Sequence, residues 1–554
     1  MEGSDFKKSN CNRKLIGARY YNVPVTTNGD QSHLASTSGS PRDSVGHGTH
    51  TASIAAGVQV PNASYYGLAQ GTAREAHRQL GLHATRHAWM LVALPSEHFT
   101  LRQMGVMVIC SAGNDGPNPY TIVNTAPWIF TVAASNIDRD FQSNIILGNG
   151  RTFTVLIGFC HQFLQSHSFK TYPLVFGKDA AGINTPVSEA RNCYPGSLDQ
   201  KKVVGKIVFV TKKLVVADTK AKGLILIDEA EKGVPFDSGI FPFTEVGNIA
   251  GLQILKYINS TQKPTATILP TVVVPQYRPA PAVAFFSSRG PAQLTENILK
   301  PDIMAPGVAV LAAIAPKNET GTVPNGKKPS KFSIKSGTSM ACPHVTGTAA
   351  FIKSVHRQWT TSMIKSALMT TATIYNNMKM PLTDNSNHFA NPHEVGVGEI
   401  NPLKALNPGL VFETKIENYL EFLCYYGYPE KNIRFMSNTK FNCPKISIEE
   451  LISNINYPSI SISKLNRRQP AKAIKRTVTN VGALNSTYIA KVQAPVGLTV
   501  SVLPEKLVFA EGVRRVSFQV SFYGKEARSG YNFGSITWFD GQHSVRTVFS
   551  VNVE

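Results

Sequence analysis

Residues 336–347 have the residue types expected around a nucleophilic serine. The segment reads Ser-Gly-Thr-Ser-Met-Ala-Cys-Pro-His-Val-Thr-Gly and leads into an apolar run at 348–352. This predicts a helix with Ser339 at its N-terminus, where backbone N–H groups and the helix dipole stabilise developing negative charge. Pro343 restricts the helix start, because we expect proline only in a first turn. By itself, the segment fits either a nucleophile or the N-cap of a structural helix.

Residues 43–53 could supply the base that such a serine needs. They read Asp-Ser-Val-Gly-His-Gly-Thr-His-Thr-Ala-Ser, so His47 lies between two glycines where a loop enters a helix predicted from about Thr49. Glycine allows close approach of the backbone, which suits a histidine that must meet a serine from a distant segment. We therefore predict that His47 is catalytic rather than structural. His50, three residues later, is interpreted as structural support.

Residues 111–117, Ser-Ala-Gly-Asn-Asp-Gly-Pro, follow directly after the apolar run 106–110. The run has the length and composition of a buried parallel strand, and the polar segment would be its exit loop. An asparagine side chain at this position, Asn114, can donate a hydrogen bond to an oxyanion. The alternative is an ordinary Asn-Asp-Gly turn.

The rest of the chain is divided by changes in pattern. Residues 128–134 repeat the buried-strand pattern, and Lys14–Tyr21 is predicted to be a strand. From about 165 to 272 short β-type runs, such as 206–210 and 223–227, alternate with turns and predict a separate inserted domain. From about 455 onward the alternating runs predict a β-sandwich of about 100 residues. The strands expected there are 477–479, 486–492, 498–502, 516–522 and 544–553.

Composition sets the class of protein. The chain has 554 residues, 42% hydrophobic and 16% charged, which predicts a globular protein of roughly three domains and excludes disordered, collagen-like and coiled-coil chains. No apolar run approaches the 18 residues of a membrane span, so no membrane partner is expected. The net charge of +21 raises the question of nucleic acid, but the densest basic cluster, at 464–476, has no interleaved aromatic residues. We expect a cationic surface and no nucleic-acid partner.

Taken together, the three segments resemble those of subtilisin-like serine proteases, in particular the large plant subtilases. Further segments carry the resemblance. They are Cys11–Tyr20, Ser40–Asp43, Phe286–Pro291, Leu299–Gly307, Asn456–Ile460 and Thr479–Gly482. The resemblance implies that Ser339 is the nucleophile, His47 the general base and Asn114 the oxyanion donor, with peptide hydrolysis through an acyl-enzyme. It also implies that Ser111, Ala112 and Gly113 form a wall of the substrate cleft, with no metal and no cofactor.

The resemblance implies an α/β fold with a doubly wound, mainly parallel sheet. The catalytic domain would span 1–164 and 273–430, interrupted by a protease-associated domain at 165–272 and followed by a fibronectin-III-like domain at 431–554. Substrates would be proteins or peptides, and the family is extracellular. Four Asn-x-Ser/Thr sequons, at Asn62, Asn259, Asn318 and Asn485, fit secretion. The first eight residues contain no apolar stretch, so the chain as given carries no signal peptide.

The sequence departs from the family's pattern at the third member of the triad. No residue matches the catalytic Asp: Asp5 has neither a preceding apolar strand nor a following glycine, and Asp43 lies in a different motif. The stretch between 71 and 111 is also shorter than in the family and has no Ser-Leu-Gly wall strand. His83 and His87 are spaced i, i+4, but no Glu follows His83, so a zinc-protease motif is not present.

Seven cysteines occur without a CxxC pair, which gives no support for zinc ribbons or thioredoxin-like motifs. Among them, the resemblance favours pairing of Cys424 with Cys443. Two hypotheses follow. The first is a secreted serine endopeptidase. The second is a catalytically impaired relative, or the product of a partial gene model, that acts only by binding peptides or partners.

Overall fold

The structure is a computed structural model. It describes residues 15–19, 42–43, 45–73, 82–85, 95–155, 170–211, 221–228, 243–315, 328–446 and 448–554, with residues 9 and 323 as isolated positions. The predictions for Asp5, His87 and Asn318 lie outside the described residues.

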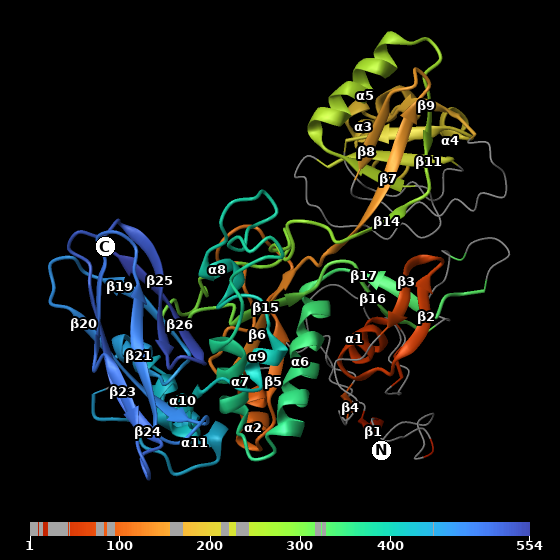
Figure 1. The fold of residues 1–554 in the computed structure, drawn as a ribbon. Coiled ribbons are helices and arrows are strands. Elements are labelled where there is room, and N and C mark those ends of the chain that lie inside the picture. The colour runs from red at the N-terminus through yellow and green to blue at the C-terminus, as the bar shows by residue number, and fades with distance from the viewer. Residues whose placement is uncertain are drawn as a thin grey trace.

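A parallel sheet forms the centre of the α/β core. It contains β5 (Val108–Ser111), β6 (Ile129–Ser135) and β15 (Ile303–Pro306), in the order β15-β6-β5. All residues of β6 are buried, as expected for the central strand of a covered sheet. Helix α6 (Thr338–Val355) packs against all three strands, and α7 (Thr361–Thr370) packs against α6 (Figure 1). The buried strand predicted at 128–134 is confirmed, whereas the strand predicted at 106–110 is present as β5 but only its Val108 is buried.

Helix α1 (His47–Ala56) lies beside α6 (Figure 1). It also packs on β16 (Val310–Ala313), which pairs with β17 (Phe332–Lys335). The hairpin of β2 (Val60–Tyr65) and β3 (Leu68–Ala73) follows α1 in the chain. These contacts fix α1 against the same helix that carries Ser339.

Strand β1 (Leu15–Arg19) confirms the strand predicted within 14–21. It pairs in parallel with β4 (Leu82–Thr85), which lies in the shortened stretch between 71 and 111. The same stretch contains α2 (Pro95–Gln103), which precedes β5. Among the described residues, β5 pairs with β6 alone, so no described strand lies on its other side.

A second β-rich unit lies apart from the parallel sheet, at the upper right of Figure 1. Its sheet has the order β12-β11-β10-β9-β13-β7-β14, with β8 paired to β7, and helix α5 (Asn248–Ser260) packs on β9 and β11. Strands β7 and β8 precede residue 165, so the sheet begins earlier in the chain than the predicted inserted segment. The strands are β7 (Arg139–Leu147), β8 (Thr152–Val155), β9 (Tyr172–Phe176), β10 (Ile207–Val210), β11 (Gly223–Ile227), β12 (Phe243–Val246), β13 (Thr265–Ile268) and β14 (Val272–Pro275). Short helices within the unit are η4 (Gly177–Ala180), α3 (Val187–Arg191) and α4 (Gln200–Val203).

The C-terminal part is a β-sandwich of two sheets, β18-β20-β24-β22 and β19-β26-β25-β21-β23. Its core includes Trp538 packed edge-on against Phe518. The five predicted strands are confirmed, and the structure adds four that the sequence analysis missed, β18, β19, β23 and β25. The sandwich strands are β18 (Leu410–Phe412), β19 (Ser459–Leu465), β20 (Lys472–Asn480), β21 (Ser486–Gln493), β22 (Thr499–Leu503), β23 (Lys506–Phe509), β24 (Arg515–Tyr523), β25 (Gly530–Phe539) and β26 (Ser544–Val553).

A buried polar network connects the parallel sheet to the start of the sandwich. The Asp302 carboxylate lies 2.7 Å from Lys300 Nζ and 3.5 Å from Lys365 Nζ, and it also accepts a hydrogen bond from the Tyr457 hydroxyl. All four side chains are buried. Removing one partner of such a network leaves an uncompensated charge, so the sandwich is coupled to the core through these contacts.

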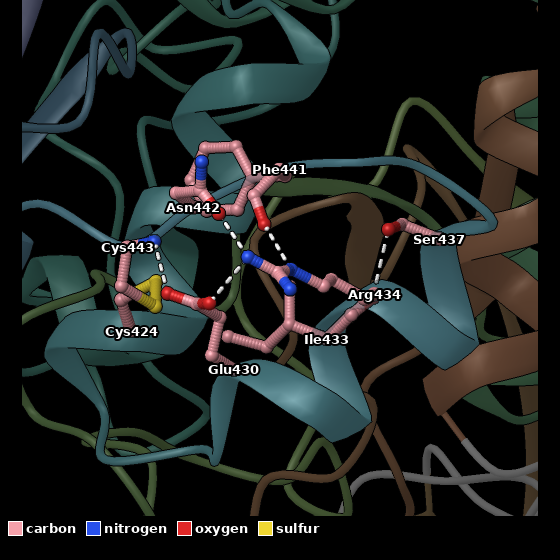
Figure 2. Close-up of a disulfide and its surroundings, with 8 residues drawn as sticks. All are labelled: Cys424, Glu430, Ile433, Arg434, Ser437, Phe441, Asn442 and Cys443. Atoms are coloured by element: carbon pink, nitrogen blue, oxygen red, sulfur yellow. Dashed lines mark hydrogen bonds and ion pairs between the residues drawn. A yellow bond between two sulfur atoms is a disulfide. The ribbon is translucent and has the colours of Figure 1, made fainter.

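The segment between core and sandwich contains the predicted disulfide, Cys424–Cys443, with a Cα–Cα distance of 5.8 Å. Figure 2 shows its surroundings, where Glu430 accepts a hydrogen bond from Cys443 N and pairs with Arg434. The bond joins α10 to the chain beyond α11. The helices of this region are α8 (Pro392–Val395), α9 (Pro402–Ala405), α10 (Ile416–Tyr425), α11 (Glu430–Ser437) and η7 (Glu449–Asn454).

Neither a membrane-spanning helix nor a cluster of metal-binding side chains is present among the described residues. None of their helices combines the length and apolar character needed to cross a membrane. No group of three or more His, Cys, Asp or Glu side chains in the same residues is arranged to hold a metal ion.

Candidate active site

Ser339 is the second residue of α6 and is half-buried. The helix begins after Gly337, whose N–H donates to Gly307 O at 2.8 Å, just beyond the end of β15. This bond ties the start of the helix to the carboxyl edge of the parallel sheet, where α/β proteins place their sites. The prediction of Ser339 at a helix N-terminus is confirmed.

The expectation for Pro343 is wrong, because this residue lies beyond the first turn, inside α6. Proline has no N–H, so the helical bond from position 343 to Ser339 O cannot form. The helix nevertheless runs on to Val355, because it is packed against all three strands of the sheet.

Asn114 lies three residues beyond β5, at the same sheet edge. Its Oδ1 accepts hydrogen bonds from Thr338 N and Thr338 Oγ1, both at 2.9 Å. Because Oδ1 faces these donors, Nδ2 points elsewhere. A Cβ built on Gly337 would lie 3.8 Å from Asn114 Nδ2 and 3.7 Å from Ser339 N. Two N–H donors therefore border one point beside Ser339, an arrangement suited to binding an oxyanion.

His47 is the first residue of α1, two residues earlier than the predicted helix start. The preceding Gly46 has φ 90°, a left-handed conformation that favours glycine. Further along the helix, the buried His50 ring has Nε2 3.1 Å from Ser333 O. This contact fixes α1 to β17 and agrees with the supporting role expected of His50. The structure thus packs the helix of His47 against the helix of Ser339.

Comparison with known proteins decides the family. Residues 96–398, more than half of the chain, match the model described as "Subtilase family". The chain belongs to the subtilase family. Residues 454–551 of this subtilase match a fibronectin type-III domain, in agreement with its sandwich.

Curated relatives are similar to this chain over all or nearly all of its length. The CO(2)-response secreted protease of Arabidopsis thaliana is 40% identical, over 100% of this chain and 77% of the relative. Subtilisin-like protease SBT5.1 of the same plant is 39% identical, over 98% of this chain and 75% of the relative. A crystal structure of the subtilisin-like protease Apa1 from Pseudoalteromonas aligns with 71% of this chain and 88% of its own, at 14% identity and a TM-score of 0.29. Members of the family are serine endopeptidases.

The electrostatic environment of this subtilase's His47 favours the neutral ring. Burial lowers the pKa of His47 to about 4, and the positive charge of Lys335 acts in the same direction. The Asp43 carboxylate acts in the opposite direction and does not restore the ordinary value. A neutral imidazole is the form that can accept a proton from a serine hydroxyl.

Asp43 is engaged at the start of α1. Its Oδ1 accepts from Val45 N at 3.0 Å and Gly46 N at 2.8 Å, and its Oδ2 accepts from Thr49 N at 2.6 Å and Thr49 Oγ1 at 2.7 Å. Burial acts to raise the pKa of Asp43, but these bonds outweigh it and lower the pKa. The carboxylate therefore serves the helix start. Asp5, the other aspartate considered from the sequence, lies outside the described residues.

The predicted cleft wall, Ser111–Gly113, lies directly before Asn114. Ser111 O accepts from Asn124 Nδ2 at 2.8 Å, and Ala112 is fully buried, with its N–H donating to Val132 O at 2.9 Å. The Ala112 and Gly113 carbonyls also accept backbone hydrogen bonds. Because these carbonyl groups already accept hydrogen bonds from the protein itself, the segment is better suited to form a rigid wall than to pair with substrate as a strand.

Two residues close to the site were missed by the sequence analysis. Thr338 binds Asn114 and lies next to Ser339, so its position in the serine segment was an available signal. Ser288 is fully buried, and its Oγ accepts from Asp115 N at 3.0 Å. It lies in the segment 286–291 that helped identify the family, but nothing in the sequence links it to a residue 173 positions away.

Proposed function

We propose that this subtilase hydrolyses peptide bonds through an acyl-enzyme on Ser339. The observation that carries the proposal is the pair of hydrogen bonds from Thr338 to Asn114 Oδ1, which leaves Asn114 Nδ2 and Ser339 N bordering the same point beside Gly337. Nucleophile and oxyanion donors are then within one small region at the carboxyl edge of the sheet. Substrates would be proteins or peptides.

In the proposed mechanism, Ser339 Oγ forms a bond to the carbonyl carbon while His47 accepts the hydroxyl proton. The resulting oxyanion accepts hydrogen bonds from Asn114 Nδ2 and Ser339 N–H. Cleavage of the C–N bond releases the amine, which takes the proton from His47. Water then attacks the acyl carbon while His47 accepts its proton. The bond between Ser339 Oγ and the acyl carbon breaks, His47 returns the proton to Ser339 Oγ, and the carboxylic acid product leaves. The lowered pKa of His47 keeps the ring available as a base at neutral pH.

The proposal extends to domains and location. We assign 165–272 to a protease-associated domain, whose sheet is completed by the neighbouring strands β7, β8 and β14, with the remainder of 1–164 and 273–430 as the catalytic parts and 431–554 as the fibronectin-III-like part. We also propose secretion, since one relative is named a secreted protease. In support, the sequon residues Asn62, Asn259 and Asn485 are all exposed and accessible to glycosylation.

A binding function without proteolysis is the second candidate. It is favoured by the edge of β5, beside which the described residues provide no further strand. A protease cleft needs walls on both sides of the scissile bond, and the wall at Ser111–Gly113 accounts for one of them. Under this alternative the inserted and C-terminal β units would bind peptides or partners.

Labelling with a fluorophosphonate probe distinguishes the two candidates. In this reaction Ser339 Oγ forms a bond to phosphorus and fluoride leaves, which requires the nucleophile, its base and the oxyanion site. A protease should label, and the Ser339→Ala variant should not. A folded wild-type chain that fails to label would overturn the proposal and favour the binding function.

A further inference from the structure

Ser288 contacts the backbone on both sides of Asn114. Its Oγ accepts from Asp115 N at 3.0 Å, and its own N–H donates to Gly113 O at 3.0 Å. Ser288 is fully buried, whereas Asn114 lies in an exposed loop. A buried serine therefore holds the residues before and after the exposed asparagine.

Close approach of the two segments depends on Gly113. Its φ is 105°, and a Cβ at this position would lie only 2.6 Å from Ser288 Oγ. The contact continues at Gly116, whose N–H donates to Phe286 O at 2.9 Å. Residues 286–288 thus run alongside 113–116 and determine where the loop lies.

We infer that Ser288 is a positioning residue for Asn114, holding the loop so that Nδ2 faces the oxyanion while Oδ1 stays bonded to Thr338. The inference rests on the proposed function for its catalytic meaning. The Thr338 bonds fix the amide group itself but not the backbone from which the side chain extends. A misplacement of about 1 Å at a catalytic group can cost roughly 100-fold in rate, so support of the backbone matters.

Ser287 provides a matched control. It is the neighbouring serine, equally buried, and its Oγ also accepts a backbone N–H at 3.0 Å. That N–H belongs to Ala134 on β6, not to the loop of Asn114. Ser288→Ala and Ser287→Ala therefore remove similar bonds, and only the first is expected to disturb Asn114.

The test compares fluorophosphonate labelling rates of the full chain with Ser288→Ala, Ser287→Ala, Asn114→Ala and the double variant Asn114→Ala/Ser288→Ala. We expect Ser288→Ala to lower the maximal labelling rate by about tenfold without changing probe affinity, the kinetic equivalent of one hydrogen bond. In the Asn114→Ala background the same change should have almost no effect, because it acts through Asn114. Equal rates for Ser288→Ala and wild type, or a full tenfold loss in both backgrounds, would overturn the inference.

Amide hydrogen exchange keeps the test independent of activity. Exchange at 113–117 should increase in Ser288→Ala and stay unchanged in Ser287→Ala. If the wild type does not label but this exchange pattern is found, the proposed function fails and the support of the loop by Ser288 holds. Unchanged exchange would overturn the support as well. If Ser288→Ala does not fold, Ser288→Cys, which retains a weak acceptor, replaces it with a smaller expected increase in exchange.

Discussion

The two parts of the candidate site are held in different ways. Asn114 and Ser339 come together through bonds between segments far apart in the chain, such as Thr338 to Asn114 and Ser288 to Asp115. The helix start that carries His47 is shaped by neighbouring residues in the chain, Asp43 and Gly46. The first part depends on the whole core, and the second depends on a short local motif and on how α1 packs.

This difference predicts that damage to the two parts will have different signatures. A change in the Asn114–Ser339 part should lower the reaction rate at Ser339, because the relative positions of distant segments change, and should leave α1 intact. A change in the His47 part should first appear as opening of α1 or as a shift in pH dependence. Four predictions test this contrast.

The largest effect is expected for Asn114→Ala. Removing one oxyanion donor typically costs about 10²–10³ in rate, since a preorganised charge-stabilising bond is lost. Fluorophosphonate labelling of Ser339 measures the loss. Asn114→Asp is the matched control: it can still accept the Thr338 bonds but has no Nδ2 donor, so it should be as slow as Asn114→Ala. An Asn114→Asp rate near wild type would show that Nδ2 is not the donor.

A second prediction concerns Glu399, which is connected to the start of the Ser339 helix through a series of hydrogen bonds. Glu399 Oε1 accepts a hydrogen bond from Ser135 Oγ at 3.1 Å. Ser135 O in turn accepts from Gly307 N at 2.9 Å, and Gly307 O accepts from Gly337 N at the start of α6. Burial raises the pKa of Glu399 from 4.5 to about 8. The folded chain therefore keeps a proton that the unfolded chain releases between these values.

Stability should consequently fall as pH rises from about 4.5 to about 8, by up to roughly 1.4 kcal/mol per pH unit from this group. Below this window both states are protonated, and above it both are ionised. Glu399→Gln removes the proton linkage, so its thermal unfolding should depend less on pH than that of wild type between pH 5 and pH 8. Parallel pH dependences for the two chains would contradict the prediction.

Sequence patterns anticipated the features set by local chemistry. The helix start at Ser339, the strand before Asn114, the alternating strands of the sandwich and the Cys424–Cys443 pair were all predictable. The roles of Ser288 and Glu399 were not, because each depends on a partner more than 150 positions away. Pro343 was misjudged for a related reason: the strands packed against α6 sustain the helix past a lost backbone bond.

A third prediction addresses the local nature of the His47 part. Asp43→Ala removes the acceptor of four hydrogen bonds at the start of α1. Asp43 is not the N-cap residue, which is Gly46, but it accepts from the same unpaired N–H groups of the helix start. Loss of an acceptor there typically costs about 1 kcal/mol, so amide exchange at 45–49 should accelerate by several-fold to roughly tenfold. Asp43→Asn retains an acceptor and should restore part of the protection. Exchange at 113–117 should not change, and an equal increase there would show that the two parts are not independent.

The smallest effect is expected from Lys335, at the end of β17. Its positive charge lowers the pKa of His47, but less than burial does. A base acts in its neutral form, so the labelling rate should stay constant from pH 8 to about pH 5 and fall by half near pH 4. Lys335→Gln removes one of the two lowering causes and should move this acid limb upward by a fraction of a pH unit, with a smaller shift at high salt. Lys331→Gln, which removes an exposed lysine four residues earlier, is the matched control and should leave the limb in place. If the wild-type labelling rate instead falls by half near pH 6.5, His47 is surrounded by solvent rather than packed beside α6. The residue that the sequence motif identifies most clearly would then be the one that the fold positions least.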